Sequence, residues 1–189
     1  DYYTQNVSPG DRVNVLKKDV EFHLVIDVSR LKCWFYAIDE NKEKILLKTY
    51  LVGLGRKDLL QPSGCLTPLG TYTLGKKVAI YKPGTMGYFQ DQKVEMIRVF
   101  GSRWIPFDKA VGENTEPVRG YGLHGTPWNE DPNTGMLTED REKIGKYDSD
   151  GCIRFNSEDI EEIFAIVISK PTVIELVKDF YESKLIKGR

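Results

Sequence analysis

The stretch YDSDGCIRFNSEDIEEIFAIV, residues 147–167, joins a short extended segment to the clearest amphipathic helix of the chain. Its apolar residues repeat at the spacing of one helical face: Ile160, Ile163, Phe164 and Val167. Asn156 or Ser157 is suited to cap this helix. The pattern predicts a strand, then a lone thiol-bearing turn at Cys152, then a helix that begins near residue 157 and ends before Pro171.

Strand signals dominate the rest of the sequence. β-Branched and aromatic runs between turn-prone residues predict strands at 22–28, 32–38, 45–54, 71–74, 94–101, 119–126 and 172–177. The first three follow one another closely, which is typical of an antiparallel meander. The Gly- and Pro-rich segment 55–70 is predicted to be a long loop. The fold class predicted from these patterns is mainly β.

Length and charge limit the classes of function. The chain has 189 residues, 40% of them hydrophobic, and a formal net charge of -1. It is long enough for one domain with a core, expected over 21–178, with 1–20 an arm or the remnant of a preceding domain and 179–189 a tail. The balanced charge argues against nucleic acid as a partner, and no apolar run is long enough to span a membrane. Because the chain begins at Asp1, we expect that its natural start, including any export signal, has been removed.

Three cysteines are too few for a disulfide scaffold. Cys33 beside Trp34 in a strand is most simply a core residue. Cys65 is a competing candidate for a nucleophile, but it has no histidine near it in the sequence. A bridge between Cys33 and Cys65 is an alternative in an oxidising compartment, and distances are needed to decide it.

A thiol nucleophile needs a base to take its proton, because a free thiol is mostly protonated at neutral pH. The chain offers two histidines. His23 alternates with its neighbours in a strand pattern and is predicted to be structural or exposed. His124 lies in GYGLHGTPW, residues 120–128, where glycines allow sharp turns. Taken alone, Cys152 and His124 are each compatible with a purely structural role.

Their combination resembles a known family. LHGT (123–126), then IGKYDSDGCIRF (144–155), the helix SEDIEEIF (157–164) and, upstream, TPLGTYTL (67–74) are similar to the catalytic domain of L,D-transpeptidases of the YkuD type. The resemblance covers residues 22–177. It implies a mixed β-sandwich of two curved sheets, mainly β, with one helix after the nucleophile strand.

The resemblance also implies an activity and roles for residues. The activity is a cysteine acyltransferase that attacks the peptide bond before the terminal D-alanine of a peptidoglycan tetrapeptide stem. Cys152 is then the nucleophile and His124 the base, and we expect a thiolate kept available by an imidazolium. The main-chain carbonyl of Gly125 would orient the imidazole. Gly151 lets the backbone bend so that N–H groups near 151 and 152 point at a developing oxyanion.

Four residues are candidates for substrate contacts. Arg154 leaves an extended segment on the same face as Cys152, where its guanidinium binds the stem's terminal carboxylate or else forms a structural ion pair. Ser149 orients the nucleophile loop or the substrate, or is a plain turn serine. Trp128 and Tyr88 wall the pocket or pack in the core.

Two features depart from the family pattern. The segment between His124 and Cys152 is longer than usual, and its excess, residues 129–143, is predicted to loop out as a lid or acceptor-side wall. Asp150 stands where many relatives have histidine, and its charge disfavours a thiolate. We therefore predict slower acylation by β-lactams than in such relatives, and faster labelling after Asp150→His.

The implied partners are peptidoglycan stem peptides, with carbapenem β-lactams as covalent inhibitors. No cofactor and no metal is expected, since zinc-type spacing and a phosphate-cradling glycine loop are not found in the sequence. The substrate implies the periplasm or cell envelope. The alternatives are an L,D-carboxypeptidase that uses water, an enzyme that tethers a lipoprotein amine, or a non-catalytic peptidoglycan-binding module.

Overall fold

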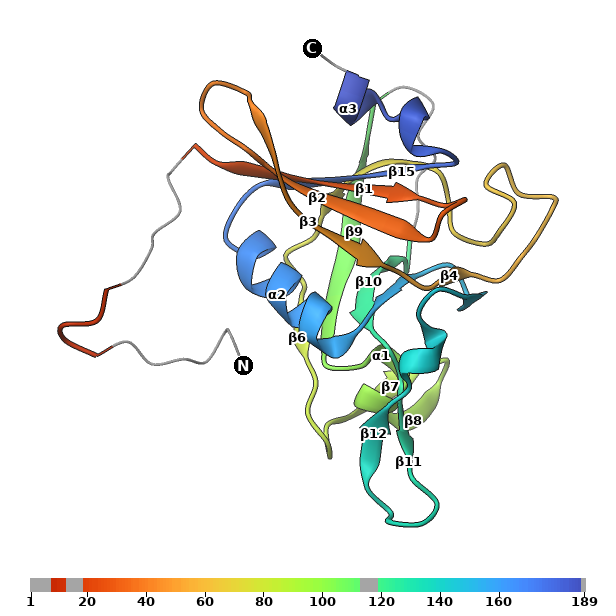
Figure 1. Ribbon diagram of the computed structural model, residues 1–189. Helices are drawn as coiled ribbons and strands as arrows, with labels where there is room; N and C mark the ends of the chain where they lie inside the picture. Colours follow the sequence, from red (N-terminus) through yellow and green to blue (C-terminus); the bar gives the residue numbers. More distant parts are fainter. Residues whose placement is uncertain (1–7, 13–18, 113–118, 188–189) are drawn as a thin grey trace.

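The computed structural model in Figure 1 describes residues 8–12, 19–112 and 119–187. Within them, nine strands share one mixed sheet: β1 (Glu21–Asp27), β2 (Lys32–Ile38), β3 (Lys44–Leu51), β5 (Gly70–Leu74), β6 (Ala79–Ile80), β9 (Arg103–Val111), β10 (Gly122–Gly125), β14 (Ile153–Phe155) and β15 (Thr172–Val177). Most of the arm predicted over 1–20 lies outside the described residues.

The remaining elements are short. Three two-stranded ribbons pair β4 (Leu54–Gly55) with β13 (Tyr147–Ser149), β7 (Met86–Phe89) with β8 (Gln92–Glu95), and β11 (Trp128–Glu130) with β12 (Leu137–Glu139). The described helices are α1 (Ile97–Phe100), α2 (Ser157–Val167), α3 (Lys184–Lys187) and the 3-10 turns η1 (Arg141–Lys143) and η2 (Phe180–Glu182).

The main sheet runs in the order β14-β10-β9-β5-β15-β1-β2-β3, and β6 pairs with β9. The predicted meander is confirmed, since β1 pairs antiparallel with β2 and β2 with β3. The last strand, β15, enters the middle of the sheet, parallel to β1 and antiparallel to β5. The first and the last strand of the main sheet in sequence order, β1 and β15, are therefore neighbours in the middle of the sheet.

Strand β9 belongs to two curved halves of this sheet. Its first residues pair with β10 and β6, and its later residues pair with β5. Because β9 passes from one half to the other, the sheet curls around a common interior. The predicted mainly β fold with a helix after the strand that follows Cys152 is confirmed, and the two curved sheets of the prediction are the two halves of this one curled sheet.

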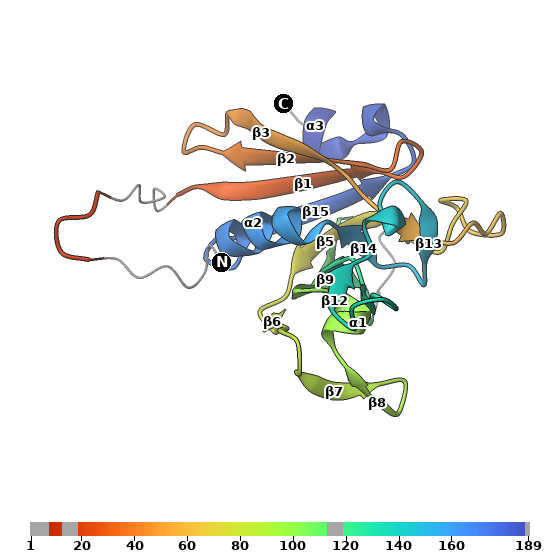
Figure 2. The ribbon, with the colours of Figure 1, turned by 60° about the horizontal axis from the view of Figure 1, so that its bottom comes forward.

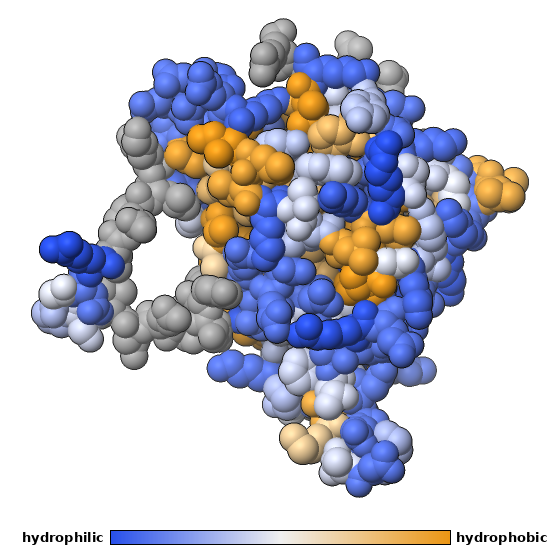
Figure 3. Space-filling model, viewed as in Figure 1, coloured by the Kyte–Doolittle hydropathy of each residue, from blue (hydrophilic) through white to orange (hydrophobic). Residues whose placement is uncertain are grey.

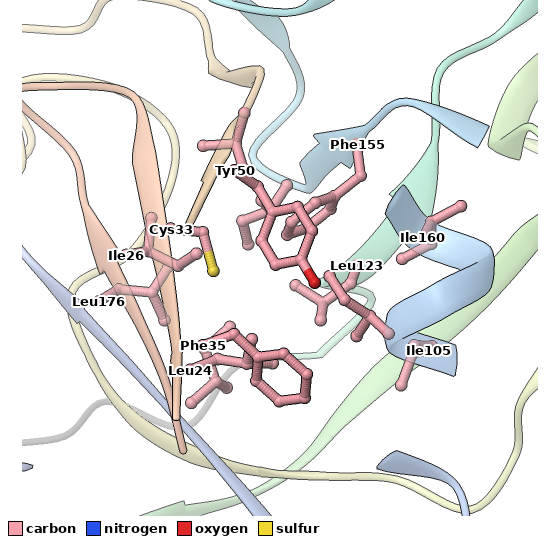
Figure 4. Close-up of a cluster of buried hydrophobic side chains, with 14 of the residues drawn as sticks. Leu24, Ile26, Cys33, Phe35, Tyr50, Ile105, Leu123, Phe155, Ile160 and Leu176 are labelled. Atoms are coloured by element: carbon pink, nitrogen blue, oxygen red, sulfur yellow. The ribbon is translucent and has the colours of Figure 1, made fainter. Parts of the chain in front are cut away.

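Helix α2 closes the core between these halves. Figure 2 shows α2 beneath the layer of β1, β2, β3 and β15 and beside β5, β9 and β14. Its buried residues are the four predicted from the sequence: Ile160, Ile163, Phe164 and Val167. In Figure 4, Ile160 faces a cluster in which Leu24 and Phe35 come from one half of the sheet and Leu123 and Phe155 from the other.

The prediction of a strand over 94–101 is wrong in its second half. The chain leaves β8 at Glu95 and forms the single turn α1 before Gly101, whose N–H donates to the Ile97 carbonyl. Gly101 has a φ of 62°, a region that favours glycine. The apolar run resembles a strand, but the burial of Ile97 and the aromatic contacts of Phe100 are made by a helical turn instead.

The C-terminal segment packs against the sheet. Asp27, at the end of β1, accepts the N–H of Phe180, and Glu175 on β15 accepts the N–H groups of Lys184 and Leu185. Burial acts to raise the pKa of Asp27, but hydrogen bonds from Ser29, Phe180 and Arg30 hold it below its usual value. These buried carboxylates fix the described end of the chain to β1 and β15.

Strand β3, which ends the strand order of the main sheet on the side away from β14, exposes four apolar side chains: Ile45, Leu46, Leu47 and Leu51. Figure 3 shows apolar side chains gathered on this face of the molecule. Among the described residues, no helix has the length and apolar character that crossing a membrane requires.

Candidate active site

The site is built on two neighbouring strands. β10 and β14 run parallel, with Leu123 opposite Ile153 and His124 opposite Arg154. Cys152 immediately precedes β14, and its thiol lies near the backbone N–H of Gly122, two residues before His124. Residues two apart on a strand share a face. The fold therefore places Cys152, Arg154 and His124 on one face, with His124 and Cys152 as diagonal neighbours.

His124 is held in one tautomer. Its ring is 3% exposed, and Nδ1 lies 2.7 Å from the Gly125 carbonyl oxygen. A carbonyl can only accept a hydrogen bond, so Nδ1 carries the proton and the Nε2 lone pair is left as the basic site. Burial lowers the pKa of His124 to about 4, with a contribution from Arg154, while the carbonyls of Gly125 and Phe100 oppose the shift.

Two aromatic rings surround this imidazole. Phe100 from α1 meets it edge-on with centroids 5.3 Å apart, and Trp104 from β9 lies at 6.0 Å. The close approach between the end of α1 and strand β10 depends on Gly101, where a Cβ would lie 2.6 Å from the carbonyl carbon of Gly125. Sequence reasoning missed Phe100 and Trp104, and the only signal for them was a glycine at the end of an apolar run.

Cys152 is partly exposed, and its Sγ lies 3.7 Å from the carbonyl oxygen of Gly120. Burial raises the pKa of its thiol to about 11; the Gly122 N–H and Arg154 act to lower it, and Asp150 adds to the rise. Both shifts act against the expected pair of thiolate and imidazolium. Burial instead favours a neutral thiol beside a neutral imidazole.

The loop before Cys152 is fixed from within. Gly151 has a φ of 124°, and its N–H donates to Ser149 Oγ at 3.0 Å. Ser149 Oγ donates to the Cys152 carbonyl at 2.7 Å, and Thr67 Oγ1 donates to the Gly151 carbonyl at 3.0 Å. The Gly151 N–H is thus already bonded, which corrects the expectation that it points at an oxyanion. Ser149 is buried and positions the loop rather than lining a pocket.

Arg154 combines both roles considered from the sequence. Its Nη1 lies 3.2 Å from Asp148 Oδ2, which is the structural ion pair. Its side chain is 15% exposed, and its Nε is buried without a hydrogen-bond partner. The guanidinium therefore retains donor capacity beside Cys152.

The two aromatic residues predicted to wall the pocket or to pack in the core, Trp128 and Tyr88, lie on separate hairpins. Trp128 donates from Nε1 to Ser157 Oγ at 3.4 Å, so it packs on the N-terminus of α2. Tyr88, on the projecting β7–β8 hairpin, is 76% exposed, and no contact between it and His124 or Cys152 is found within the described part of the chain. Its neighbour Phe89 instead contacts Phe100, at 5.3 Å.

Residues 129–143 form an ordered hairpin rather than an open loop. The turn predicted near Asp131 is present, since Asp131 accepts from Gly135 and bonds back to Met136. At the base, Glu139 accepts the N–H of Ser157 at 2.6 Å and the hydroxyl of Thr126. The insertion is thus tied both to the helix N-terminus and to the strand of His124.

The other two thiols lie in the core. Cys33 and Cys65 are buried, and all three cysteines are free. The Cys33–Cys65 bridge left open by the sequence is therefore not present in the structure. Within residues 8–12, 19–112 and 119–187, no group of three His, Cys, Asp or Glu side chains is placed to hold a metal ion.

Asp150→His is expected to speed alkylation of Cys152 by iodoacetamide about two- to threefold at pH 8, because it removes a charge that disfavours the thiolate. Asp150 is 68% exposed and pairs with Arg56 at 2.8 Å, so its effect is partly screened. The rate is measured by mass spectrometry. Arg56→Ala is the matched control and should slow the reaction. Slower alkylation of Asp150→His would contradict this view of the site.

Comparison with known proteins agrees with the fold. The family model of the YkuD, or L,D-transpeptidase, catalytic domain matches residues 21–175. No curated protein sequence matches this chain.

Solved structures share the fold at low sequence identity. Bd1075 of Bdellovibrio bacteriovorus is 14% identical, with a TM-score of 0.53 over 84% of this chain and 48% of that one. A mutant of the helical cell shape determining protein Pgp2 of Campylobacter jejuni is 16% identical, with a TM-score of 0.52 over 86% of this chain and 48% of that one. This chain spans about half the length of both structures. From the family match over most of its length, the chain belongs to the L,D-transpeptidase catalytic domain family.

Proposed function

We propose that this domain is a cysteine-dependent L,D-transpeptidase that acts on the tetrapeptide stems of peptidoglycan. The observation that carries the proposal is the partly exposed thiol of Cys152 beside His124, whose proton is fixed on Nδ1 by the Gly125 carbonyl. Family membership supplies the substrate class. The rest of the mechanism follows from the chemistry of these groups.

In the acylation step the Nε2 atom of His124 takes the thiol proton as sulfur attacks the carbonyl that precedes the terminal D-alanine. A carbon–sulfur bond forms and the carbonyl becomes a tetrahedral oxyanion. The carbon–nitrogen bond then breaks, and the imidazolium returns its proton to the departing D-alanine amine. Because both groups rest neutral, proton transfer accompanies attack, and His124 acts as a general base.

The thioester is resolved by a second nucleophile. The side-chain amine of a neighbouring stem attacks the thioester carbonyl while His124 Nε2 takes its proton. An amide forms, the carbon–sulfur bond breaks, and His124 passes that proton to the leaving sulfur. Phe100 and Trp104 keep water away from the imidazole, which strengthens the electrostatic interactions there. Arg154 receives the free carboxylate of the donor stem through the exposed part of its guanidinium.

Proteins with this domain act on peptidoglycan, so their site of action is outside the cytoplasm. We infer the periplasm or cell envelope as the location of this domain. Carbapenems, whose strained lactam mimics the scissile bond, are expected to acylate Cys152. Water or a lipoprotein amine would resolve the same thioester, so the products distinguish the acceptors.

The products formed from purified disaccharide-tetrapeptides test the proposal. We expect cross-linked dimers and an equal amount of free D-alanine, measured by liquid chromatography and mass spectrometry. Tripeptides with D-alanine and without dimers would identify a carboxypeptidase instead. Unchanged tetrapeptides, bound but never cleaved, would show a non-catalytic binding module and overturn the enzyme proposal.

A further inference from the structure

Three charged side chains meet beside the reacting pair. Asp148 Oδ2 lies 2.6 Å from Lys143 Nζ and 3.2 Å from Arg154 Nη1. The pKa of Asp148 is held below its usual value, with Lys143 as the largest cause and Arg154 also contributing. Two cations thus share one carboxylate, and the three side chains together carry one excess positive charge.

The backbone fixes this arrangement. Gly53 exchanges two hydrogen bonds with Arg154, its N–H reaching the Arg154 carbonyl at 2.9 Å and its carbonyl accepting the Arg154 N–H at 2.8 Å. A Cβ on Gly53 would overlap the Lys143 carbonyl oxygen and would lie 3.3 Å from the Arg154 Cβ. Lys143 and Arg154 are therefore brought together by a close approach of three chain segments that only glycine permits.

The excess positive charge of this cluster acts on the base and the thiol of the site. Arg154 contributes to the pKa shifts of both His124 and Cys152, so its guanidinium lies within electrostatic reach of base and thiol. Its Nε is buried without a partner. An anion that enters beside Cys152 would meet a partly exposed guanidinium whose charge Asp148, shared with Lys143, does not fully compensate.

We propose that Lys143 sets the preference of this site for donors that end in a free carboxylate, by holding Asp148 so that Arg154 can bind the donor. This inference rests on the proposed function for the identity of the donor. Without Lys143, Asp148 has Arg154 as its remaining cation in the cluster, the cluster becomes neutral, and a second carboxylate is no longer attracted. Lys143 comes from the end of the insertion 129–143, so a segment that departs from the family pattern supplies the selectivity.

Binding to Cys152→Ala tests this without turnover. The probes are a tetrapeptide stem ending in D-alanine and the same peptide ending in D-alaninamide, and the dissociation constants are measured by calorimetry. Lys143→Met is expected to weaken binding of the acid about fivefold, because one partly exposed charge partner is lost. The dissociation constant of the amide should stay unchanged. Lys146→Met is the matched control, since Lys146 is 58% exposed and pairs only loosely with Glu142 at 3.8 Å.

A double variant separates charge from structure. Lys143→Met/Asp148→Asn restores one excess positive charge, so it should recover most of the affinity for the acid. Equal losses for acid and amide, no loss for the acid, no measurable binding of the acid, or failure of the rescue would each overturn the role of Lys143. Failure of the proposed function is seen separately, as the absence of product from tetrapeptides with Cys152 intact.

Discussion

Cys152→Ala is expected to abolish covalent capture of a carbapenem. In the parent protein the thiol opens the lactam, a carbon–sulfur bond replaces the carbon–nitrogen bond, and the mass rises by one drug molecule. The other two thiols are buried and have no histidine identified beside them in the structure, so the variant should gain no mass. Intact-protein mass spectrometry checks this. Cys65→Ala should keep the adduct, and an adduct on Cys152→Ala would refute the assignment.

The rate of the same reaction reports on His124. A general base must be neutral, so the parent rate should fall as the pH drops through about 4, where the buried imidazole gains its proton. Above that value the rate should stay nearly level until the thiol ionises near pH 11. His124→Gln should lower the level rate by about 10² or more.

Gly151→Ala is expected to lower the free energy of unfolding by about 3 kcal/mol or more, and to remove Cys152 reactivity in the molecules that still fold. The backbone at Gly151 has a φ of 124°, where a side chain is strained. A Cβ there would also overlap the ring of Tyr121 and lie 2.9 Å from the Leu66 carbonyl oxygen. Urea unfolding followed by circular dichroism measures the loss.

Gly64→Ala is the matched control. Gly64 has a φ of 77°, but a Cβ there meets nothing within 4 Å, so only the backbone term, about 1 kcal/mol, should be lost. The difference between the two variants contains the contact with Tyr121 and the additional backbone strain at a φ of 124°. Tyr121→Ala combined with Gly151→Ala should recover some of it. Equal losses at Gly64 and Gly151 would show that the close contact with Tyr121 has no energetic weight.

Periodicity predicted most of the fold. The meander of β1, β2 and β3, the helix α2 and the strand β15 all follow from patterns within a single segment. Sheet order could not be obtained in that way, because β15 pairs with β1 and β5 through contacts far apart in the sequence. The turn α1 was missed because its apolar residues do not differ in kind from those of a strand.

The candidate site was likewise predicted only in part from the sequence. The resemblance identified His124, Cys152 and the Gly125 carbonyl; the structure places the first two on or beside neighbouring strands and shows the hydrogen bond between His124 and the Gly125 carbonyl. Protonation states depend on burial, which single residues in a sequence do not reveal; the neutral thiol was therefore not predicted. The same holds for Phe100 and for the pairing of Lys143 with Asp148.

The central position of β15 has a consequence for synthesis of the protein. While the ribosome is still making residues 172–177, β1 has no parallel neighbour and β5 lacks one of its partners. The nascent chain can form local hairpins, but the sheet stays divided, with apolar strand surfaces open to aggregation. Completion of the domain must therefore wait until residues 172–177 have emerged from the ribosome.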